Sequence, residues 1–448
     1  MIDLAVRYGV VVDGTGVAER PADVGIDDGR IVAVGEVPEA RREVDATGKV
    51  VTPGFVDIHS HSDFTLLVDP RAASAIHQGV TLEVVGNCGF GCFPLLNKEL
   101  APKAIYGHSA DVPLTWTSAS EYFERLEEAR PAINVASLVP NGQIRLSVVG
   151  LADRPARPDE LARMRYLLDE ALEQGAFGYS TGLEYAAERG ADEDELVSLC
   201  EVCGRHHGLY ATHTRHRDEG ADEAVAEALR TARRSGVRLQ VSHLVPRNGI
   251  ESSRRCVELV EGSAAAGTDV AFDMHTRLYG TTFLLAALPP RALEEPGRLE
   301  EILRSDEERR RLSRYESILS AGGDWSRIVL LDNDAWPGYA RRDIASIAAE
   351  RGQDALDTVY DLLLGAAAAP ETLMVIIHAY TEAQQREAFG HPLCVPGSDA
   401  TTLAPDGPLA GRVFHGAYTW AAWYLRFVRE EKVLSLPEAI HRLSLIHI

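Results

Sequence analysis

Two histidines separated by one residue, His59 and His61, lie just after the first Pro-Gly turn of the chain. The segment 56–63 that contains them is typical of a short strand, in which residues i and i+2 point to the same side. The two imidazoles can therefore reach one metal ion, and a protein-bound metal commonly activates water. Because 15 histidines in 448 residues give about 0.5 such pairs by chance, the pair alone is equally consistent with two ordinary strand histidines.

Four further potential metal ligands each follow an apolar run that is typical of a strand: Cys88, His213, His243 and Asp399. In a barrel of parallel strands, chemistry takes place where the strands end. Five strands that each lead into a histidine, a cysteine or an aspartate therefore indicate one shared site rather than five unrelated positions.

The elements that must position these residues alternate between strands and helices through most of the chain. Residues 158–173 place apolar side chains on one helical face, and Ser118 opens a capping box that predicts a helix to Ala129. This order predicts parallel strands with helical crossovers. Without a phosphate-binding glycine loop, it favours a metal-dependent (β/α)8 TIM-type barrel over residues 52–448. A charged, less regular stretch at about 289–340 is expected to form an insertion or lid.

Residues 1–51 have a different pattern, in which short apolar runs are separated by Asp-Gly turn signals. The pattern predicts a small unit of about four strands, which we expect to be the N-terminal portion of a β-sandwich. The chain as a whole is therefore expected to be an α/β protein.

The composition limits the partners and the compartment. The net charge of −22 argues against nucleic acid or an anionic membrane as the main partner. No run of about 18 apolar residues occurs, so no segment is expected to span a membrane, and no signal peptide is expected. Six cysteines in 448 residues do not indicate a disulfide scaffold, and the cytoplasm is the expected location.

Short motifs surround the candidate ligands: His59-Ser60-His61, Gly86-Asn87-Cys88-Gly89, Ser180-Thr181-Gly182-Leu183-Glu184-Tyr185, the strand-end His213 and His243, and Gly397-Ser398-Asp399. As a set, they resemble the motifs of the amidohydrolase superfamily and, within it, of the N-acyl-D-amino-acid deacylase (D-aminoacylase) family. The resemblance covers roughly residues 3–445, and Gly-Asn-Cys-Gly is its most diagnostic part.

The resemblance implies six zinc ligands in two sets, one tight and one weaker: Cys88, His213 and His243, and then His59, His61 and Asp399. It also allows Cys88 to bridge the two sets. It also implies that Asp399 is the catalytic residue, which takes a proton from water and returns it to the leaving amine. Tyr185 matches a tyrosine that faces the substrate. The implied reaction hydrolyses a small N-acyl-D-amino acid to a carboxylate and a free D-amino acid.

Lysine is scarce, and the chain has only Lys49, Lys98, Lys103 and Lys432. Relatives of the dihydroorotase and hydantoinase type use a carboxylated lysine on a barrel strand to bridge two metals. No lysine occurs between Lys103 and Lys432, so Cys88 is the expected replacement, because a thiolate is a strong zinc ligand.

The chain departs from the family pattern near the expected substrate. The segment 213–219 is two residues longer than the commoner form, residues 244–246 contain no lysine where one is expected, and Gly416 follows His415 in place of an arginine. These differences leave the substrate open. Two alternatives to the deacylase are another amidohydrolase reaction, such as hydrolysis of a cyclic amide or an isoaspartyl dipeptide, and an inactive metal-binding homologue.

The ending of the chain also differs from the family pattern. Related proteins continue with a Leu-Pro-Ala segment and strands that complete the N-terminal sandwich, whereas this chain runs through Ser444 to residues 445–448. We therefore expect a truncated or artefactual terminus, which would leave unpaired edges on the sandwich.

Overall fold

The computed structural model describes residues 1–293, 298–320, 323–412, 414 and 416–444. The expectations for His415 and for the ending at 445–448 concern residues outside this description. Within the described ranges, no helix is both long enough and apolar enough to cross a membrane.

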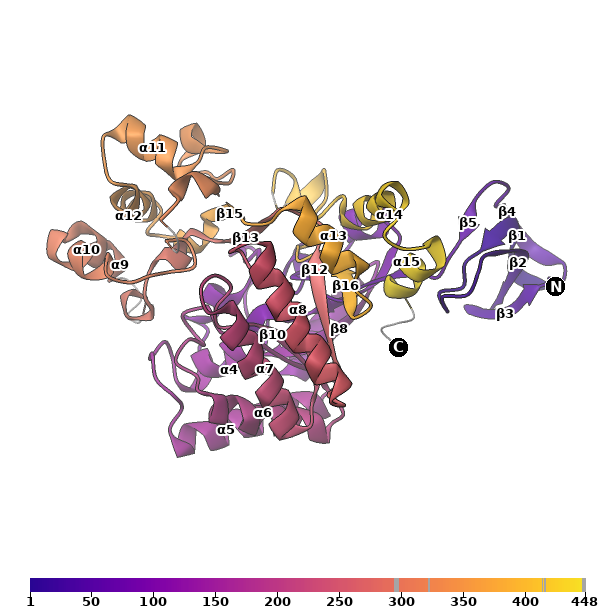
Figure 1. The fold of residues 1–448 in the computed structure, drawn as a ribbon, viewed down its shortest axis with the longest axis horizontal. Helices are drawn as coiled ribbons and strands as arrows, with labels where there is room; N and C mark the ends of the chain where they lie inside the picture. Colours follow the sequence, from indigo (N-terminus) through magenta and orange to yellow (C-terminus); the bar gives the residue numbers. More distant parts are fainter. Residues whose placement is uncertain (294–297, 321–322, 413, 415, 445–448) are drawn as a thin grey trace.

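A sheet of eight parallel strands forms the centre of the molecule (Figure 1). Its strands are β6 (Phe55–Asp57), β7 (Val80–Val85), β8 (Asn134–Pro140), β9 (Gly178–Gly182), β10 (Leu209–His213), β11 (Arg238–Val241), β12 (Val270–His275) and β16 (Cys394–Gly397). Neighbours in the sheet follow the chain from β6 to β12, and β16 pairs with β12. A bridge between Ser60 and Ala400 joins the segments that follow β6 and β16. The eight strands therefore form a nearly closed ring, and the predicted (β/α)8 barrel is confirmed.

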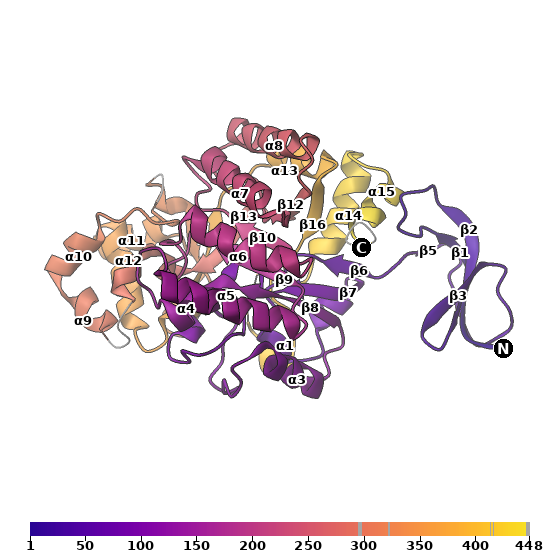
Figure 2. The same cartoon turned by 90° about the horizontal axis from the view of Figure 1, so that it is seen from below.

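Helices alternate with these strands and surround the barrel (Figure 2). They are α1 (Thr65–Val68), α2 (Ala73–Ile76), α3 (Ala119–Ala129), α4 (Asn141–Val148), α5 (Pro158–Glu173), α6 (Glu193–Arg205), α7 (Ala221–Ser235), α8 (Ile250–Ala265), α13 (Glu382–Gly390), α14 (Trp420–Glu431) and α15 (Leu436–Arg442). Ser118 forms the predicted capping box at the start of α3, and α5 has the predicted bounds. In α7, the buried residues Val225, Leu229 and Ala232 repeat at helical spacing, so this face packs into the main core.

An inserted region lies between β12 and β16, at one end of the molecule in Figure 1. It contains the antiparallel strands β13 (Tyr279–Phe283), β14 (Ile328–Leu330) and β15 (Met374–His378), with the helices α9 (Leu299–Arg304), α10 (Asp306–Leu312), α11 (Ile344–Arg351) and α12 (Ala355–Gly365). The stretch 289–340 falls inside this region. Its buried side chains form a second hydrophobic core that includes Phe90 and Tyr106 from the barrel loops. The inserted region therefore packs against the loops that follow the barrel strands.

The N-terminal residues form a separate sheet at the opposite end of the molecule (Figure 1). Its strands are β1 (Ile2–Val11), β2 (Arg20–Asp27), β3 (Arg30–Gly35), β4 (Ala40–Asp45) and the two-residue β5 (Val50–Val51). The order is β3-β2-β1-β4, and β5 also pairs with β1. The predicted small β unit is confirmed, with one short strand more than the four expected.

Candidate metal centre

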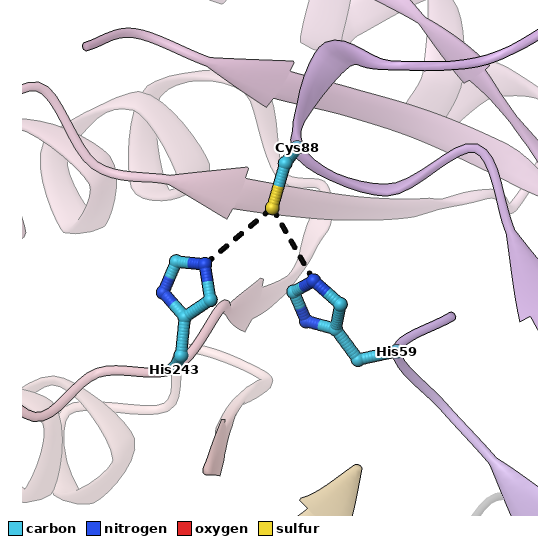
Figure 3. Close-up of side chains that lie close together, drawn as sticks. All are labelled: His59, Cys88 and His243. Carbon is cyan, nitrogen blue, oxygen red and sulfur yellow. Dashed lines mark hydrogen bonds between the residues drawn. The ribbon is translucent and has the colours of Figure 1, made fainter. Parts of the chain in front are cut away.

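The sulfur of Cys88 lies between two imidazoles at the carboxyl ends of the barrel strands (Figure 3). Its Sγ is 3.3 Å from Nε2 of His59 and 3.5 Å from Nε2 of His243. All three side chains are buried, and their ligand atoms lie within 4.8 Å of one another. They are close enough to converge on one cation.

A second group shares His59 with the first. Oδ1 of Asp399 lies 3.7 Å from Nε2 of His59 and 3.3 Å from Nε2 of His61. These three ligand atoms also lie within 4.8 Å of one another. The structure therefore brings five of the six proposed ligands into two groups with one common histidine.

His213, the sixth proposed ligand, lies beside the first group but belongs to neither. Its ring centroid is 4.7 Å from that of His243, and its Nε2 lies 2.7 Å from Oε2 of Glu184. Its other nitrogen, Nδ1, is buried without a hydrogen-bond partner among the described residues. Since the carboxylate of Glu184 accepts a hydrogen bond from Nε2–H, the uncharged imidazole carries its lone pair on Nδ1.

The strand that carries the two histidines is shorter than expected. β6 ends at Asp57, whereas the sequence pattern favoured a strand over residues 56–63. The reason is the side chain of Asp57, whose Oδ1 accepts hydrogen bonds from the backbone N of His59 at 3.3 Å and of Ser398 at 2.9 Å. The carboxylate thus replaces strand pairing where β6 and β16 close the ring.

Three of the candidate ligands have unusual backbone conformations. Cys88, His243 and Asp399 have positive φ angles of 53°, 34° and 46°, in the backbone region that residues other than glycine rarely adopt. Each such residue costs on the order of 1 kcal/mol or more, and such strain concentrates at functional sites. The turn after each strand therefore aims the side chain at the centre of the barrel mouth.

The Gly-Asn-Cys-Gly motif needs its glycines for close packing. A Cβ on Gly86 would lie 2.2 Å from the carbonyl oxygen of Leu138, and a Cβ on Gly89 would lie 1.6 Å from Oε1 of Glu188. Both glycines also have positive φ angles. The neighbouring strands can therefore approach Cys88 only because these two positions carry no side chain.

Burial keeps most of the candidate ligand histidines uncharged. It lowers the pKa of His61 and of His243, and it lowers the pKa of His213 to about 4 despite the hydrogen bond to Glu184. His59 differs, because the charges of Asp273 and Cys88 outweigh its burial and raise its pKa. Uncharged imidazoles retain the lone pair that a metal requires.

The carboxyl group of Asp399 is held in its ionised form. Burial alone would raise its pKa, but the hydrogen bond from His61 and the charge of Arg277 outweigh that effect and hold the pKa below its ordinary value. Nη2 of Arg277 lies 2.9 Å from Oδ2 of Asp399. The carboxylate is therefore ionised at neutral pH, as a metal ligand must be.

The donors in these groups fit a zinc ion. Zinc in proteins is bound by imidazole nitrogen, thiolate sulfur and carboxylate oxygen, and all three occur here within a few ångströms. The unpartnered Nδ1 of His213 points to the same conclusion, because a buried nitrogen with a free lone pair costs free energy unless something binds it.

Sequence reasoning missed a carboxylate behind the ligands. Oδ1 of Asp273, in β12, lies 3.1 Å from Nδ1 of His59 and accepts a hydrogen bond from the backbone N of His243 at 2.8 Å. Such a carboxylate orients ligating histidines and makes them more basic. The strand-end signal that identified the other residues applies to Asp273 as well.

Sequence reasoning also missed His275, the last residue of β12, and Arg277, which lies two residues beyond the strand. Nε2 of His275 lies 3.8 Å from Oδ2 of Asp399, and Arg277 pairs with that same oxygen. A Cβ on Gly416 would lie 3.0 Å from Cδ of Arg277. Because Gly416 has no side chain, Arg277 has room to lie at this position.

Two adjoining cavities open beside the candidate ligands. The first has an empty volume of about 680 Å³ and is lined mainly by apolar side chains, among them Phe90, Leu146 and Leu285. The second, of about 410 Å³, is polar and is lined by the candidate ligands and by arginines. Tyr185 and Cys88 line both cavities.

Asp63, which closely follows the two histidines in the chain, is buried. Its Oδ1 has no hydrogen-bond partner among the described residues, so it does not orient a histidine ligand. The helix α1 has Phe64 as its N-cap without a side-chain hydrogen bond. Burial raises the pKa of Asp63 to about 7.

Comparisons with known proteins agree with this geometry. A family model described as the amidohydrolase family matches residues 42–310, which is more than half of the chain. The chain belongs to the amidohydrolase family. It is 32% identical to the N-acyl-D-glutamate deacylase of Alcaligenes xylosoxydans xylosoxydans over 99% of this chain and 82% of that protein. This amidohydrolase therefore belongs with the D-aminoacylases of the family.

Solved structures give the same grouping. The N-acyl-D-glutamate deacylase from Bordetella bronchiseptica, complexed with zinc and a phosphonate inhibitor, matches with a TM-score of 0.79 and 29% identity over 100% of this chain and 85% of that chain. A D-aminoacylase described with a binuclear metal centre matches with a TM-score of 0.80 and 29% identity, over 99% and 84%. These neighbours are metal-binding amidohydrolases with the same barrel.

Proposed function

We propose that the chain is a zinc-dependent N-acyl-D-amino-acid deacylase. It would hydrolyse the amide of a small N-acyl-D-amino acid to a carboxylate and a free D-amino acid. The observation that carries the proposal is the ionised Asp399 beside the buried Cys88–His59–His243 group. The similarity of the whole chain to deacylases supports the choice of an amide substrate.

We assign the metal to the convergent donors. Cys88 and His243, with His213 beside them, would hold a tightly bound zinc, and Nδ1 of His213 is the nitrogen of that side chain left without a hydrogen-bond partner. His59, His61 and Asp399 would form a second, weaker position. When bound, zinc polarises the amide carbonyl and lowers the pKa of water to about 7. The shared position of His59 between the two groups fits a pair of neighbouring metal positions.

Asp399 moves the proton in the proposed reaction. Its carboxylate accepts a proton as the water oxygen attacks the amide carbonyl carbon, and it donates that proton to the amine nitrogen as the C–N bond breaks. The ion pair with Arg277 and the contact with His61 hold the carboxylate in place. Atoms balance, because one water and one amide give one carboxylic acid and one amine.

The apolar cavity would receive an uncharged part of the substrate. It adjoins Cys88, so a group bound there lies next to the reacting amide. Apolar side chains such as Leu146 and Leu285 favour an acyl or side-chain group without charge. Tyr185, which lines both cavities, would contact the substrate where the two meet.

The proposal is tested by amine release from paired N-acetyl-D- and N-acetyl-L-amino acids, with zinc added. We expect release from D-substrates alone and its loss after metal removal with a chelator, with recovery when zinc is restored. Silence across the panel from soluble, zinc-loaded protein would refute the deacylase. Release from a cyclic amide or an isoaspartyl dipeptide instead would identify the other amidohydrolase reaction.

A further inference from the structure

His213 contacts a buried carboxylate that no step of the proposed reaction uses, and the inference drawn from it rests on the assignment of His213 to zinc in the proposed function. An imidazole can offer a metal only the nitrogen that carries no hydrogen. Nε2 of His213 lies 2.7 Å from Oε2 of Glu184, whereas Nδ1 is buried without a hydrogen-bond partner among the described residues. The position of Glu184 therefore decides which nitrogen of His213 can face the metal.

Glu184 is held by a buried arginine. Nη2 of Arg247 lies 2.6 Å from Oε1 of Glu184, and Nη1 lies 3.3 Å from Oε2, so the guanidinium and the carboxylate face each other through two hydrogen bonds. The side chains of Glu184 and Arg247 are only 8% and 3% exposed. Because solvent screens such a buried pair weakly, the pair fixes the position of the carboxylate.

Asp218 holds the other side of the same guanidinium. Its Oδ2 accepts hydrogen bonds from Nε of Arg247 at 3.0 Å and from Nη2 at 2.6 Å. Arg247 thus lies between two carboxylates, and it cannot turn toward one without losing contact with the other. The result is a row of four contacting side chains that runs from Asp218 to His213.

The row is built by the loops in which this chain departs from the family pattern. Asp218 lies in the lengthened segment 213–219, and Arg247 directly follows the segment that lacks the expected lysine. Glu184 lies two residues after the end of β9. The loops after the neighbouring strands β9, β10 and β11 therefore each contribute one charged residue to the row.

We infer that Glu184 is a positioning residue for the metal, because it accepts the hydrogen bond from Nε2–H of His213 and so directs Nδ1 at the zinc. Arg247 and Asp218 act through Glu184 by holding its carboxylate in place. A carboxylate behind a ligating histidine fixes the tautomer of the ring and raises its basicity. The altered loops thus serve the metal at His213.

Glu184→Gln is the variant that reverses the histidine. Because the guanidinium of Arg247 only donates hydrogen bonds, the amide oxygen of the variant must face it. The amide nitrogen then faces Nε2 of His213 and favours the tautomer whose proton blocks Nδ1. We expect zinc affinity, measured by competition with chelators of graded affinity, to fall by about 10–100-fold.

The tautomer can be observed directly in the metal-free protein. Nitrogen-15 spectra of histidine-labelled protein should show the proton of His213 on Nε2 in the wild type and on Nδ1 in Glu184→Gln. The signals of His213 are assigned by their loss in His213→Ala.

The same change in a His213→Ala background separates a role through His213 from a role in the fold. If Glu184 acts on the metal only through this ring, Glu184→Gln should change the zinc affinity of His213→Ala by less than about threefold. Glu227→Gln is the matched control, because Glu227 also pairs with an arginine, Arg215, at 2.9 Å. Its carboxylate is bonded to no candidate ligand among the described residues, so this variant should bind zinc like the wild type.

An equal fall of zinc affinity in both backgrounds, or an unchanged affinity in Glu184→Gln, would overturn the inference. Zinc binding by His213→Ala as tight as that of the wild type would also overturn it, because His213 would then not be a ligand. Amine release by the wild type is measured separately, and its absence refutes the proposed deacylase whatever Glu184→Gln does to zinc affinity.

Discussion

Asp273→Asn tests whether the carboxylate behind the ligands determines metal affinity. Asp273 accepts three hydrogen bonds, from His59 at 3.1 Å and His243 at 2.8 Å through Oδ1, and from Gln240 at 3.1 Å through Oδ2. Asparagine keeps the volume and the Oδ1 acceptor but removes the charge. The amide nitrogen of the new asparagine would face the amide nitrogen of Gln240. The side-chain amide of Gln240 must therefore flip to present its oxygen as the acceptor.

The magnitudes follow from this geometry. The hydrogen bonds from His59 and His243 become weaker because their acceptor loses its charge, and the hydrogen bond with Gln240 must form again with its amide reversed. We therefore expect the free energy of unfolding to fall by about 1–2 kcal/mol. Zinc affinity should fall further, by about 10–100-fold, because partners behind ligating histidines have effects of that size. The loss of charge also removes the interaction that raises the pKa of His59.

Two assays separate these effects. Competition with a chelator of known affinity measures zinc binding, and urea unfolding of the metal-free protein measures stability. Asp269→Asn is the matched control, since Asp269 is an exposed aspartate next to β12. If Asp273→Asn binds zinc within about threefold of the wild type, the reasoning about this carboxylate is wrong.

Gly89→Ala should cost about 3 kcal/mol or more in urea unfolding, because its Cβ would lie 1.6 Å from Oε1 of Glu188. Gly150→Ala has a similar φ of 74° but nothing within 4 Å, so its cost should be limited to about 1 kcal/mol of backbone strain, and equal costs would contradict the packing argument. Burial raises the pKa of Glu188 to about 8, against 4.5 for a free carboxyl. The wild type should therefore lose stability as the pH rises from 4.5 to 8, because the unfolded carboxyl releases its proton first. Glu188→Gln should flatten that part of the profile of stability against pH, and an unchanged slope would show that Glu188 titrates normally.

Much of the barrel could be predicted because its signals are local. The apolar runs, the capping box at Ser118 and the helical spacing over 158–173 each depend on residues close together in the chain. The strand-end rule placed Cys88, His243 and Asp399 at one rim because parallel strands all end on the same side.

The pairings within the site depend on distant parts of the chain, and the sequence did not reveal them. The resemblance allowed Cys88 to bridge the two sets, and the closing of the ring brings its sulfur within 3.3 Å of His59, but no local pattern gives that distance. The sheet of β13, β15 and β14 was missed because it pairs Tyr279 with His378 across an intervening region.

The most direct measurement is zinc content and amine release in Asp399→Asn, with the wild type alongside. If Asp399 moves the proton, the variant keeps its tightly bound zinc and loses about 10²–10⁴-fold in kcat on an N-acetyl-D-amino acid. Near-normal turnover in a variant that retains zinc would contradict the account of this site.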